Sequence, residues 1–408
     1  MAAFFSEVDA AWLSAQLGRE VKSLALDEVD LEKLNKLNCM RFAVVEYADG
    51  RSDRLVIKMS APSESSQLLG LAREAYWYRD WRSLVATTAP GDDDASKPSS
   101  GGLEGILPRV LFSSGSMATG EKVLVMEDLS VVSVQLGHLF GAGNPNNWGK
   151  DLEALTSKLS GGPIGVPEAT RLAFCAAARL HASYWGNSDL LLEDRAPWLR
   201  GAAWLCGNDK QQWMDTQANT AALWSQVKAK MGDTNYTVRW DPLLVAVVDA
   251  SVARAAGEAG WERYQAELRA RPFTLVHGDF HPANVLLEPG SRVVLVDWEA
   301  VGLGSGPQEL GQFMISHTLP AVRASIEREA VAAYHAELCR CNAAVAPTLS
   351  LADCWQEYVL GGLARWLFFL PFDGWGAPPA VSQFFCDQVL AWVSDHGITA
   401  NDAPMPRL

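Results

Sequence analysis

The sequence predicts an α+β chain of two lobes, a small antiparallel β-sheet followed by a larger and mainly helical part. Short segments that alternate apolar and polar residues, the pattern of half-buried strands, fall mostly in the first third of the chain. From about residue 128 onward the apolar residues recur mainly at helical spacing, apart from a strand-rich segment at 274–299. Strands followed by helices, rather than alternating with them, are typical of an α+β arrangement. We therefore expect an N-terminal lobe at 1–127 and a C-terminal lobe at 128–408.

The elements of the N-terminal lobe follow from local patterns. Residues 20–60 contain the strand-like segments VKSLAL, MRFAVVEY and DRLVIKM, and Asp49-Gly50 between the last two predicts a hairpin. Residues 63–85 have helical spacing after a serine-rich start that can cap the helix. Residues 87–105 are rich in Gly, Ser, Pro and Asp without periodicity, which predicts a flexible surface loop. The segments ILPRVLFSS and KVLVMEDLS then predict two further strands.

Composition excludes several functional classes. The net charge of −14 and the pI near 5.0, with no basic stripe, argue against a nucleic-acid partner. No segment approaches the roughly 20 uninterrupted apolar residues of a membrane span. The seven cysteines form no disulfide framework, which indicates reduced thiols and a cytoplasmic location.

The most informative segment is VHGDFHPANVLLEPGSRVVLVDWE, at residues 276–299. Asn284 follows Asp279 by five residues, and Asp297 comes at the end of the apolar strand VVLV. An Asp that accepts a hydroxyl proton, together with an Asn and a second Asp that hold Mg²⁺, is the equipment of phosphoryl transfer. Magnesium needs only one or two carboxylates beside the substrate phosphates. The alternative, two aspartates in turns that flank a hairpin, explains neither the Asn nor the spacing.

These residues resemble the aminoglycoside phosphotransferase and choline kinase superfamily, whose members share the protein kinase-like fold. The shared pattern is H-G-D-x-H-P-x-N followed by D-W-E at 297–299. The element LHASYW at 180–185 is similar to one in the ecdysteroid kinase-like (CHK kinase-like) group. Protein kinases carry H-R-D and D-F-G at the corresponding places. The resemblance implies an ATP- and Mg²⁺-dependent phosphotransferase that acts on the hydroxyl of a small molecule, with Asp279 as the catalytic residue and Asn284 and Asp297 as metal ligands.

The same resemblance implies the nucleotide-binding residues. Lys58 ends the third strand, where this fold holds the α- and β-phosphates, and Glu74 on the following helix is its expected partner. Glu64 is a rival partner, although its place at the helix start favours a role in stabilising the helix N-terminus. The backbone of Glu127 and Leu129 is expected to bond the adenine edge.

One element of the family pattern is missing. The segment DEVDLEKLNKLNCMRF, where a glycine-rich loop should cover the phosphates, contains no glycine. Lys33, Lys36 or Arg41 could supply positive charge there, or could form a solvated basic face. The missing glycines leave open a pseudokinase that binds nucleotide without turnover, and a protein acceptor is a third alternative.

The sequence also predicts residues that support the site. His277 and His281 are expected to brace the catalytic loop rather than to bind metal, and by resemblance Glu309 caps or braces the same loop. The acceptor site is expected in the helices of residues 185–270 and 350–376. Their aromatic and acidic residues would suit a quaternary amine, whereas a mostly apolar pocket would suit a sterol or lipid-like alcohol. The residues concerned are Trp185, Trp198, Trp204, Trp355, Trp366 and Trp375, with Asp353, Glu357 and Asp373.

Overall fold

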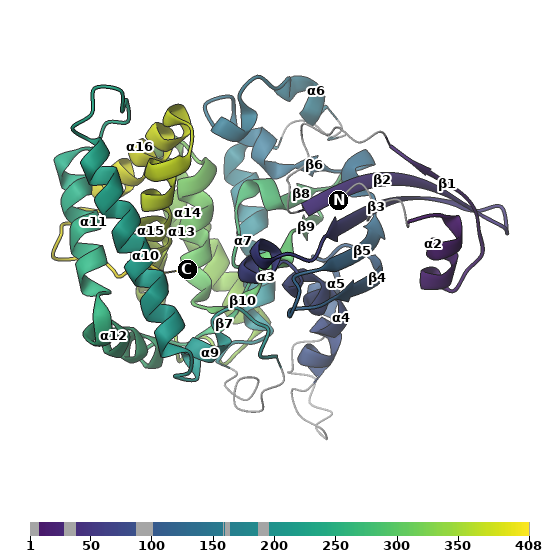
Figure 1. Cartoon of the computed structure of the whole chain (residues 1–408), viewed down its shortest axis with the longest axis horizontal. Coiled ribbons are helices and arrows are strands. Elements are labelled where there is room, and N and C mark those ends of the chain that lie inside the picture. Colours follow the sequence, from purple (N-terminus) through teal and green to yellow (C-terminus); the bar gives the residue numbers. More distant parts are fainter. Residues whose placement is uncertain are drawn as a thin grey trace.

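A computed structural model describes residues 8–27, 38–86, 101–157, 159, 164–186 and 196–407. An antiparallel sheet lies on one side of the molecule and a large group of helices on the other (Figure 1). The predicted α+β fold with a small sheet and a larger helical lobe is confirmed. Lys33 and Lys36, and residues 87–100 of the predicted loop, lie outside the described residues.

The sheet has five antiparallel strands in the order β1-β2-β3-β5-β4. All five had been predicted from alternating patterns. Their bounds are β1 (Val21–Leu26), β2 (Asn38–Tyr47), β3 (Ser52–Ser60), β4 (Val110–Gly115) and β5 (Lys122–Glu127). The hairpin between β2 and β3 turns at Gly50, which adopts a positive φ of 82° as a tight turn requires.

The alternation of β3 decides which of its side chains reach the helical lobe. Successive side chains of a strand point to opposite faces. Leu55 and Ile57 belong to an apolar cluster that includes Leu13 of helix α2 (Ala10–Leu17). Val56 belongs instead to the core that continues into the helical lobe. Lys58 shares the face of Val56 and is therefore directed toward the junction of the two lobes.

The helix predicted at residues 63–85 is divided in two. Helix α3 (Glu64–Leu69) begins at Ser63, whose hydroxyl accepts from the Ser66 amide as the predicted cap. Gly70 then ends this helix with a left-handed φ of 67°, and α4 (Arg73–Ala86) follows. Glycine is the residue that adopts this conformation without steric cost, so the break is local in origin. The prediction of one continuous helix was wrong at this position.

The remaining elements belong mainly to the helical lobe (Figure 1). The last part of the predicted 87–105 loop forms a short helix, α5 (Gly101–Glu104). The other helices are α6 (Leu152–Thr156), α7 (Val166–Ala182), α9 (Ala202–Leu205), α10 (Lys210–Lys230), α11 (Pro242–Arg254), α12 (Gly257–Arg269), α13 (Gly306–His317), α14 (Pro320–Cys341), α15 (Leu351–Gly376) and α16 (Pro379–Asp395). The 3-10 helices are η1 (Leu129–Val131), η2 (Leu136–Phe140), η3 (Pro145–Asn147), η4 (Pro282–Asn284) and η5 (Trp298–Ala300). Short strands are β6 (Val134–Gln135), β7 (Thr274–Val276), β8 (Val285–Leu287), β9 (Val293–Leu295) and β10 (Gly302–Gly304).

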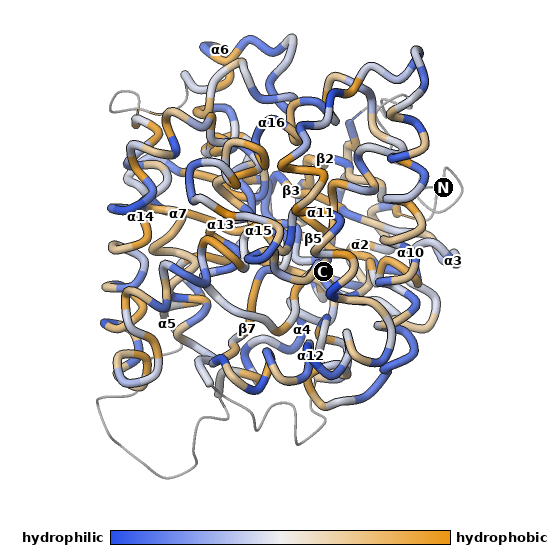
Figure 2. The backbone as a smooth tube through the Cα atoms, turned by 90° about the vertical axis from the view of Figure 1, so that its left-hand side faces the viewer, coloured by the Kyte–Doolittle hydropathy of each residue, from blue (hydrophilic) through white to orange (hydrophobic). Residues whose placement is uncertain are grey.

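The core of the helical lobe contains α7, α13 and α15, along which Figure 2 shows hydrophobic stretches. Helices α13 and α15 cross where Gly311 meets Gly362. A Cβ atom built on Gly311 would lie only 2.5 Å from the Cα of Gly362, so the two backbones are in direct contact. Within the described ranges, no helix is both long and apolar enough to span a membrane.

Candidate active site

The catalytic loop leaves strand β7 through a backbone turn that only glycine fits. Gly278 has a φ of 81°, a region that side chains rarely adopt. A Cβ at this position would also lie 1.9 Å from the carbonyl oxygen of Ala300. The glycine of the H-G-D pattern is therefore required by the close approach of the two chain segments, and it directs Asp279 out of the sheet.

Glu309 of α13 holds this turn in place. Its carboxylate accepts hydrogen bonds from the backbone N–H of His277, at 2.9 Å, and from that of Gly278. It also accepts from the Nε2 of His181 at 3.0 Å, and the Nδ1 of His181 lies 2.8 Å from the hydroxyl of Tyr334. The expected bracing role of Glu309 is confirmed by these contacts, which tie the loop to three helices.

The two histidines of the loop also act as braces. The Nε2–H of His277 donates to the carbonyl of Val296 at 3.0 Å, while its Nδ1 accepts from the Asp279 amide at 3.3 Å. Burial lowers the pKa of His277, so the ring is neutral at physiological pH. His281 accepts from the Ala283 amide through Nδ1, and its Nε2 lies 3.3 Å from the carboxylate of Asp279. The predicted hydrogen bond from an imidazole N–H to a backbone carbonyl is confirmed for His277.

The carboxylate of Asp279 is held by several donors. Asn284 donates through Nδ2 to the Asp279 carboxylate at 3.2 Å and to its carbonyl at 3.0 Å, and Gln312 donates to the other carboxylate oxygen at 3.1 Å. Burial raises the pKa of Asp279, but the neighbouring His281 and Arg365 outweigh burial and bring the pKa below its ordinary value. The group is therefore ionised at neutral pH, and 39% of its side chain is exposed. It can orient a hydroxyl and accept its proton.

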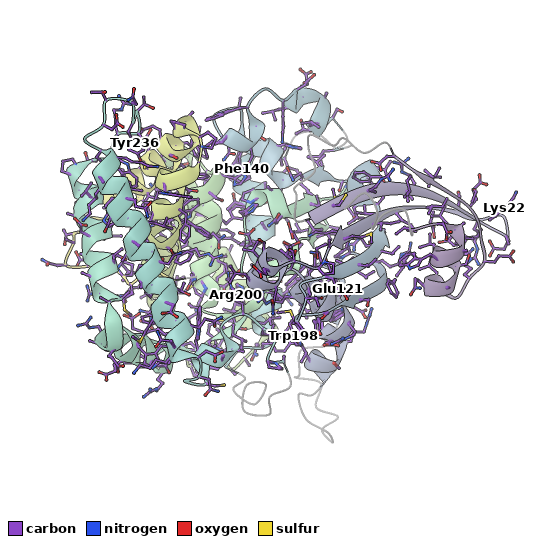
Figure 3. The ribbon with its side chains drawn as sticks, viewed as in Figure 1. Lys22, Glu121, Phe140, Trp198, Arg200 and Tyr236 are labelled. Carbon is purple, nitrogen blue, oxygen red and sulfur yellow. The ribbon has the colours of Figure 1, made fainter. Side chains whose placement is uncertain are left out.

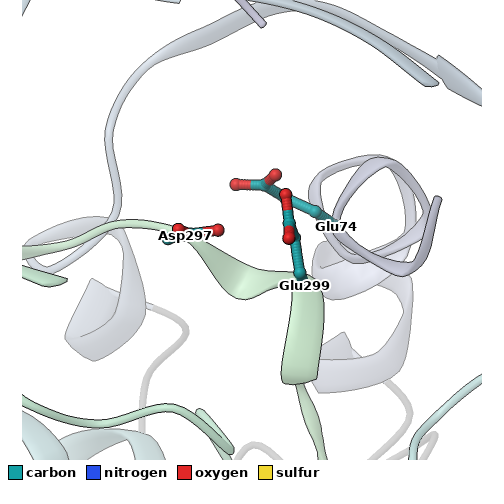
Figure 4. A group of neighbouring side chains, drawn as sticks. All are labelled: Glu74, Asp297 and Glu299. Carbon is teal, nitrogen blue, oxygen red and sulfur yellow. The ribbon is translucent and has the colours of Figure 1, made fainter. Parts of the chain in front are cut away.

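A network of charges joins the sheet to the catalytic segment. The ammonium of Lys58 lies 2.8 Å from Glu74, 2.7 Å from Asp297 and 2.9 Å from Glu299. Burial would lower the pKa of Lys58, but these carboxylates raise it well above its ordinary value. Figure 4 shows the three carboxylates directed toward a common space. Of the two partners considered for Lys58, Glu74 is therefore in contact with it, whereas Glu64 is exposed on α3.

A second lysine in this network was missed by the sequence analysis. Lys122 is fully buried, its ammonium lies 2.6 Å from Glu74, and it is ion-paired with Glu299. It shares one face of β5 with Leu124 and Met126, because the three residues alternate along the strand. That alternation, with a charged residue on an otherwise buried face, is the signal from which Lys122 could have been found.

One cavity, of about 570 Å³, lies between the sheet and the catalytic segment. Its walls are largely apolar, and Lys58, Asn284 and Asp297 stand at its polar end. Glu127 and Leu129 also line it. The Leu129 carbonyl accepts from the amides of Val132 and Ser133 and from the Ser133 hydroxyl.

A second cavity, of about 480 Å³, lies on the other side of Asp297. Asp279 and Asp297 both line it, so the two cavities meet at the catalytic segment. Two of the tryptophans predicted for the acceptor site, Trp198 and Trp204, contribute to its wall together with Phe369. Figure 3 shows Trp198 where the helical lobe meets the sheet.

The acidic residues predicted for the acceptor site do not line this cavity. Glu357 is ion-paired with Arg271 and Arg407, and the amide of Asp353 is capped by Ser350 at the start of α15. Asp373 lies further along the same helix. The cavity next to Asp279 thus has the predicted aromatic residues Trp198 and Trp204 in its wall, but none of the three predicted acidic residues.

Comparison with known proteins supports an enzyme of the predicted class. Residues 154–341 match the phosphotransferase enzyme family, which confirms the expectation of a phosphotransferase. No curated protein is significantly similar to the chain.

Three of the solved structures to which this chain is similar are small-molecule kinases. A choline kinase from Streptococcus pneumoniae is 11% identical, with a TM-score of 0.47, and the similarity covers 94% of this chain and 97% of that one. An ethanolamine kinase from Plasmodium vivax is 10% identical, with a TM-score of 0.46 and coverage of 91% and 81%. A macrolide 2'-phosphotransferase from Brachybacterium faecium is 17% identical, with a TM-score of 0.37 and coverage of 93% and 99%.

Proposed function

We propose that the chain is an ATP- and Mg²⁺-dependent kinase that transfers the γ-phosphate of ATP to the hydroxyl of a small molecule. The observation that carries the proposal is the meeting of two cavities at Asp297. One cavity has apolar walls for a purine and ends at Lys58 and Asn284, and the other contains Asp279. A nucleotide in the first cavity and an alcohol in the second would place the donor and acceptor on either side of the catalytic segment.

The residues have distinct roles in this proposal. Asp279 orients the acceptor hydroxyl and takes its proton as the hydroxyl oxygen bonds to the γ-phosphorus. The bond between that phosphorus and the oxygen of the β-phosphate breaks, and ADP leaves. Lys58, held by Glu74, binds the α- and β-phosphates. Because the transition state is loose, such a site acts mainly by positioning and by neutralising charge.

The oxygen donors at the junction suit magnesium. Asn284 uses its amide nitrogen to bond Asp279, which leaves its carbonyl oxygen for a cation, and 43% of the Asp297 side chain is exposed. An amide oxygen, one carboxylate and substrate phosphates form a donor set that Mg²⁺ accepts. Of the three carboxylates at the junction, that of Asp297 is 43% exposed, against 1% for Glu74 and 20% for Glu299, so Asn284 and Asp297 are the proposed ligands. When bound, the ion would neutralise the negative charge of the nucleotide phosphates.

Finer assignments belong to the same proposal. The ecdysteroid kinase-like group is favoured by the element at 180–185, whose His181 supports Glu309 and hence the catalytic loop. A lobe boundary after Glu127 agrees with the end of β5. A cytoplasmic location rests on the pattern of cysteines in the sequence.

The test compares nucleotide binding with turnover. Magnesium-ATP should raise the melting temperature, because a ligand that binds only the folded state stabilises it. Slow hydrolysis of ATP, with water in place of the acceptor, should accompany this shift. Asp279→Asn should reduce hydrolysis at least about a hundredfold while keeping the shift, whereas Asp297→Ala should weaken the shift itself.

Three results would count against the proposal. A thermal shift without hydrolysis, and without a phosphorylated product from a broad screen of alcohols, would indicate a pseudokinase. Phosphorylation of a protein but of no small alcohol would indicate a protein kinase. Absence of any thermal shift with magnesium-ATP would contradict nucleotide binding altogether.

A further inference from the structure

Three arginine side chains line the proposed acceptor cavity. They are Arg73, Arg200 and Arg365. Arg73 donates to the carbonyls of Trp198, at 2.8 Å, and Glu299, at 2.6 Å. Within the described part of the chain, each of the three bonds backbone carbonyls and none forms an ion pair with a carboxylate. Figure 3 shows Arg200 beside Trp198 at the junction of the lobes.

Arg365 is the most informative of the three. Its side chain comes from α15, is 3% exposed, and donates through Nη2 to the carbonyl of Gly278 at 2.7 Å. The Nε and Nη1 atoms have no hydrogen-bond partner among the described residues. A buried donor without a partner destabilises the folded state, and more so when it is charged. The ring of Phe369, whose centroid lies 4.6 Å from the guanidinium carbon, covers one side of the group but does not replace those hydrogen bonds.

Within the described residues, the carboxylates around the cavity form no direct ion pair with the three arginines. Asp297 is paired with Lys58, and Glu299 with both Lys58 and Lys122. Asp279 attracts Arg200 and Arg365 electrostatically, but its carboxylate oxygens accept hydrogen bonds from Asn284 and Gln312 and are needed to receive the hydroxyl proton. Asp209 is an exposed residue of the cavity wall. Within the described residues, no carboxylate therefore bonds these guanidinium groups directly, and the Nε and Nη1 atoms of Arg365 are buried, so a neighbouring side chain must shift for a ligand to reach them.

We propose that the phosphate acceptor is a hydroxy acid, an alcohol that carries a carboxylate or another oxyanion close to its hydroxyl. This inference rests on the proposed function and specifies the substrate class of the same site. The guanidinium fork of Arg365 matches the two oxygens of such a group. Because Arg365 bonds Gly278, the residue next to Asp279, the anion and the accepting hydroxyl are separated by only a few covalent bonds. Trp198, Trp204 and Phe369 provide room for an apolar part of the molecule.

The inference excludes the class of acceptor that an aromatic and acidic pocket would have suited. A cationic amine next to Arg365 and Arg200 would be repelled, and it would leave both guanidinium groups without an anionic partner. A neutral alcohol would fill the aromatic part of the cavity but would leave the Nε and Nη1 donors of Arg365 without acceptors of matching charge.

The experiment measures magnesium-ATP turnover with matched alcohols on the full chain. Mandelate is compared with its neutral amide, mandelamide, and with the cationic amino alcohol 2-amino-1-phenylethanol, which carries its hydroxyl on the same benzylic carbon. Glycerol phosphate and glycerol form a second pair, which separates a phosphate from a carboxylate as the anionic group. We expect kcat/KM for the better anionic member to exceed those of its neutral and cationic counterparts at least about tenfold, equivalent to roughly 1.4 kcal/mol. No anionic preference in either series, or a preference for 2-amino-1-phenylethanol, overturns the inference.

Variants locate the effect at the guanidinium groups. Arg365→Gln should raise KM for the preferred anion at least about tenfold while leaving the thermal shift with magnesium-ATP in place. Arg365→Lys keeps the positive charge but loses the two-pronged guanidinium geometry. Its KM for the anion should therefore lie between those of Arg365→Gln and the wild type. Arg323→Gln removes an equally buried arginine of α14 that is paired with Asp395, remote from the cavity, and should leave KM unchanged.

The outcomes also separate this inference from the proposed function. If the thermal shift and the Asp279-dependent hydrolysis are present but the anion gives no advantage, only the substrate class is wrong. If Arg365→Gln and Arg323→Gln raise KM equally, the effect comes from stability and the assignment to Arg365 is refuted. If the shift and the hydrolysis are both absent, the proposed function fails first.

Discussion

Removal of the buried charge of Lys122 should destabilise the protein by several kcal/mol. The ammonium of Lys122 is fully buried and lies 2.6 Å from Glu74, which is itself buried. Lys58 and Lys122 together face three carboxylates, those of Glu74, Asp297 and Glu299, so the network carries a net charge of −1. In Lys122→Met the net charge of the network becomes −2, while its carboxylates stay in the same surroundings. Loss of one partner of a buried ion pair costs about 3–5 kcal/mol, and we expect a loss in this range.

The assay is urea unfolding followed by tryptophan fluorescence, with the free energy of unfolding taken from the midpoint and slope. The matched control is Lys228→Met. Lys228 also lies 2.6 Å from a carboxylate, that of Asp249, but both side chains are more than 40% exposed. Exposed pairs contribute about 0–1 kcal/mol. The reasoning is refuted if Lys122→Met loses no more stability than Lys228→Met.

A double variant separates charge from packing. Glu299→Gln in the background of Lys122→Met returns the network to a net charge of −1, so the double variant should recover part of the lost stability. If it recovers nothing, the loss arises from the aliphatic stem of Lys122 and not from its charge.

Three further predictions concern the backbone and one carboxyl group. Gly278→Ala should abolish ATP turnover and lower the melting temperature, because the new Cβ would lie 1.9 Å from the Ala300 oxygen. The control is Gly290→Ala, at a similar φ of 86° but with no atom near the new Cβ, which should be less strained and should keep turnover. Gly311→Ala should be destabilising by roughly 1–3 kcal/mol, as is typical of overpacking, measured by urea unfolding; a neutral result would mean that the helices can separate. Burial raises the pKa of Asp373 to about 6, so the folded state binds more protons than the unfolded state between about pH 4 and pH 6, and stability falls as the pH rises through this window. Asp373→Asn should therefore stabilise the protein above pH 6 by up to about 3 kcal/mol, an advantage that should disappear below pH 4 and that a pH series of unfolding curves would detect.

The catalytic residues were predictable because their chemistry is encoded in a short segment. Asp279, Asn284 and Asp297 lie within twenty residues of one another, and the turn at Gly278 fixes their direction locally. Lys58 was also predictable, since the alternation of a single strand decides the face on which it lies. The five strands of the sheet followed from the same period-two pattern.

The residues that were missed act over long sequence separations. Arg365 reaches Gly278 from 87 residues away, and Lys122 reaches Glu299 from 177 residues away. Neither contact leaves a local pattern, because each depends on how helices or lobes pack. The division of the 63–85 helix was missed for a different reason. Gly70 lies within an amphipathic pattern, and only its left-handed conformation shows that it ends a helix.

The contact of Gly311 with Gly362 has a consequence for the way in which this pocket could adapt to other molecules. It joins the helix that carries Glu309 to the helix that carries Arg365, with no side chain between them that could be enlarged or trimmed. The part of the pocket wall that α15 forms with Arg365 and Phe369 is thus a fixed surface, and changes in preferred substrate size should arise by substitution elsewhere in the wall, around Trp204. Directed evolution toward bulkier alcohols would be expected to collect its mutations there and to leave the glycine pair untouched.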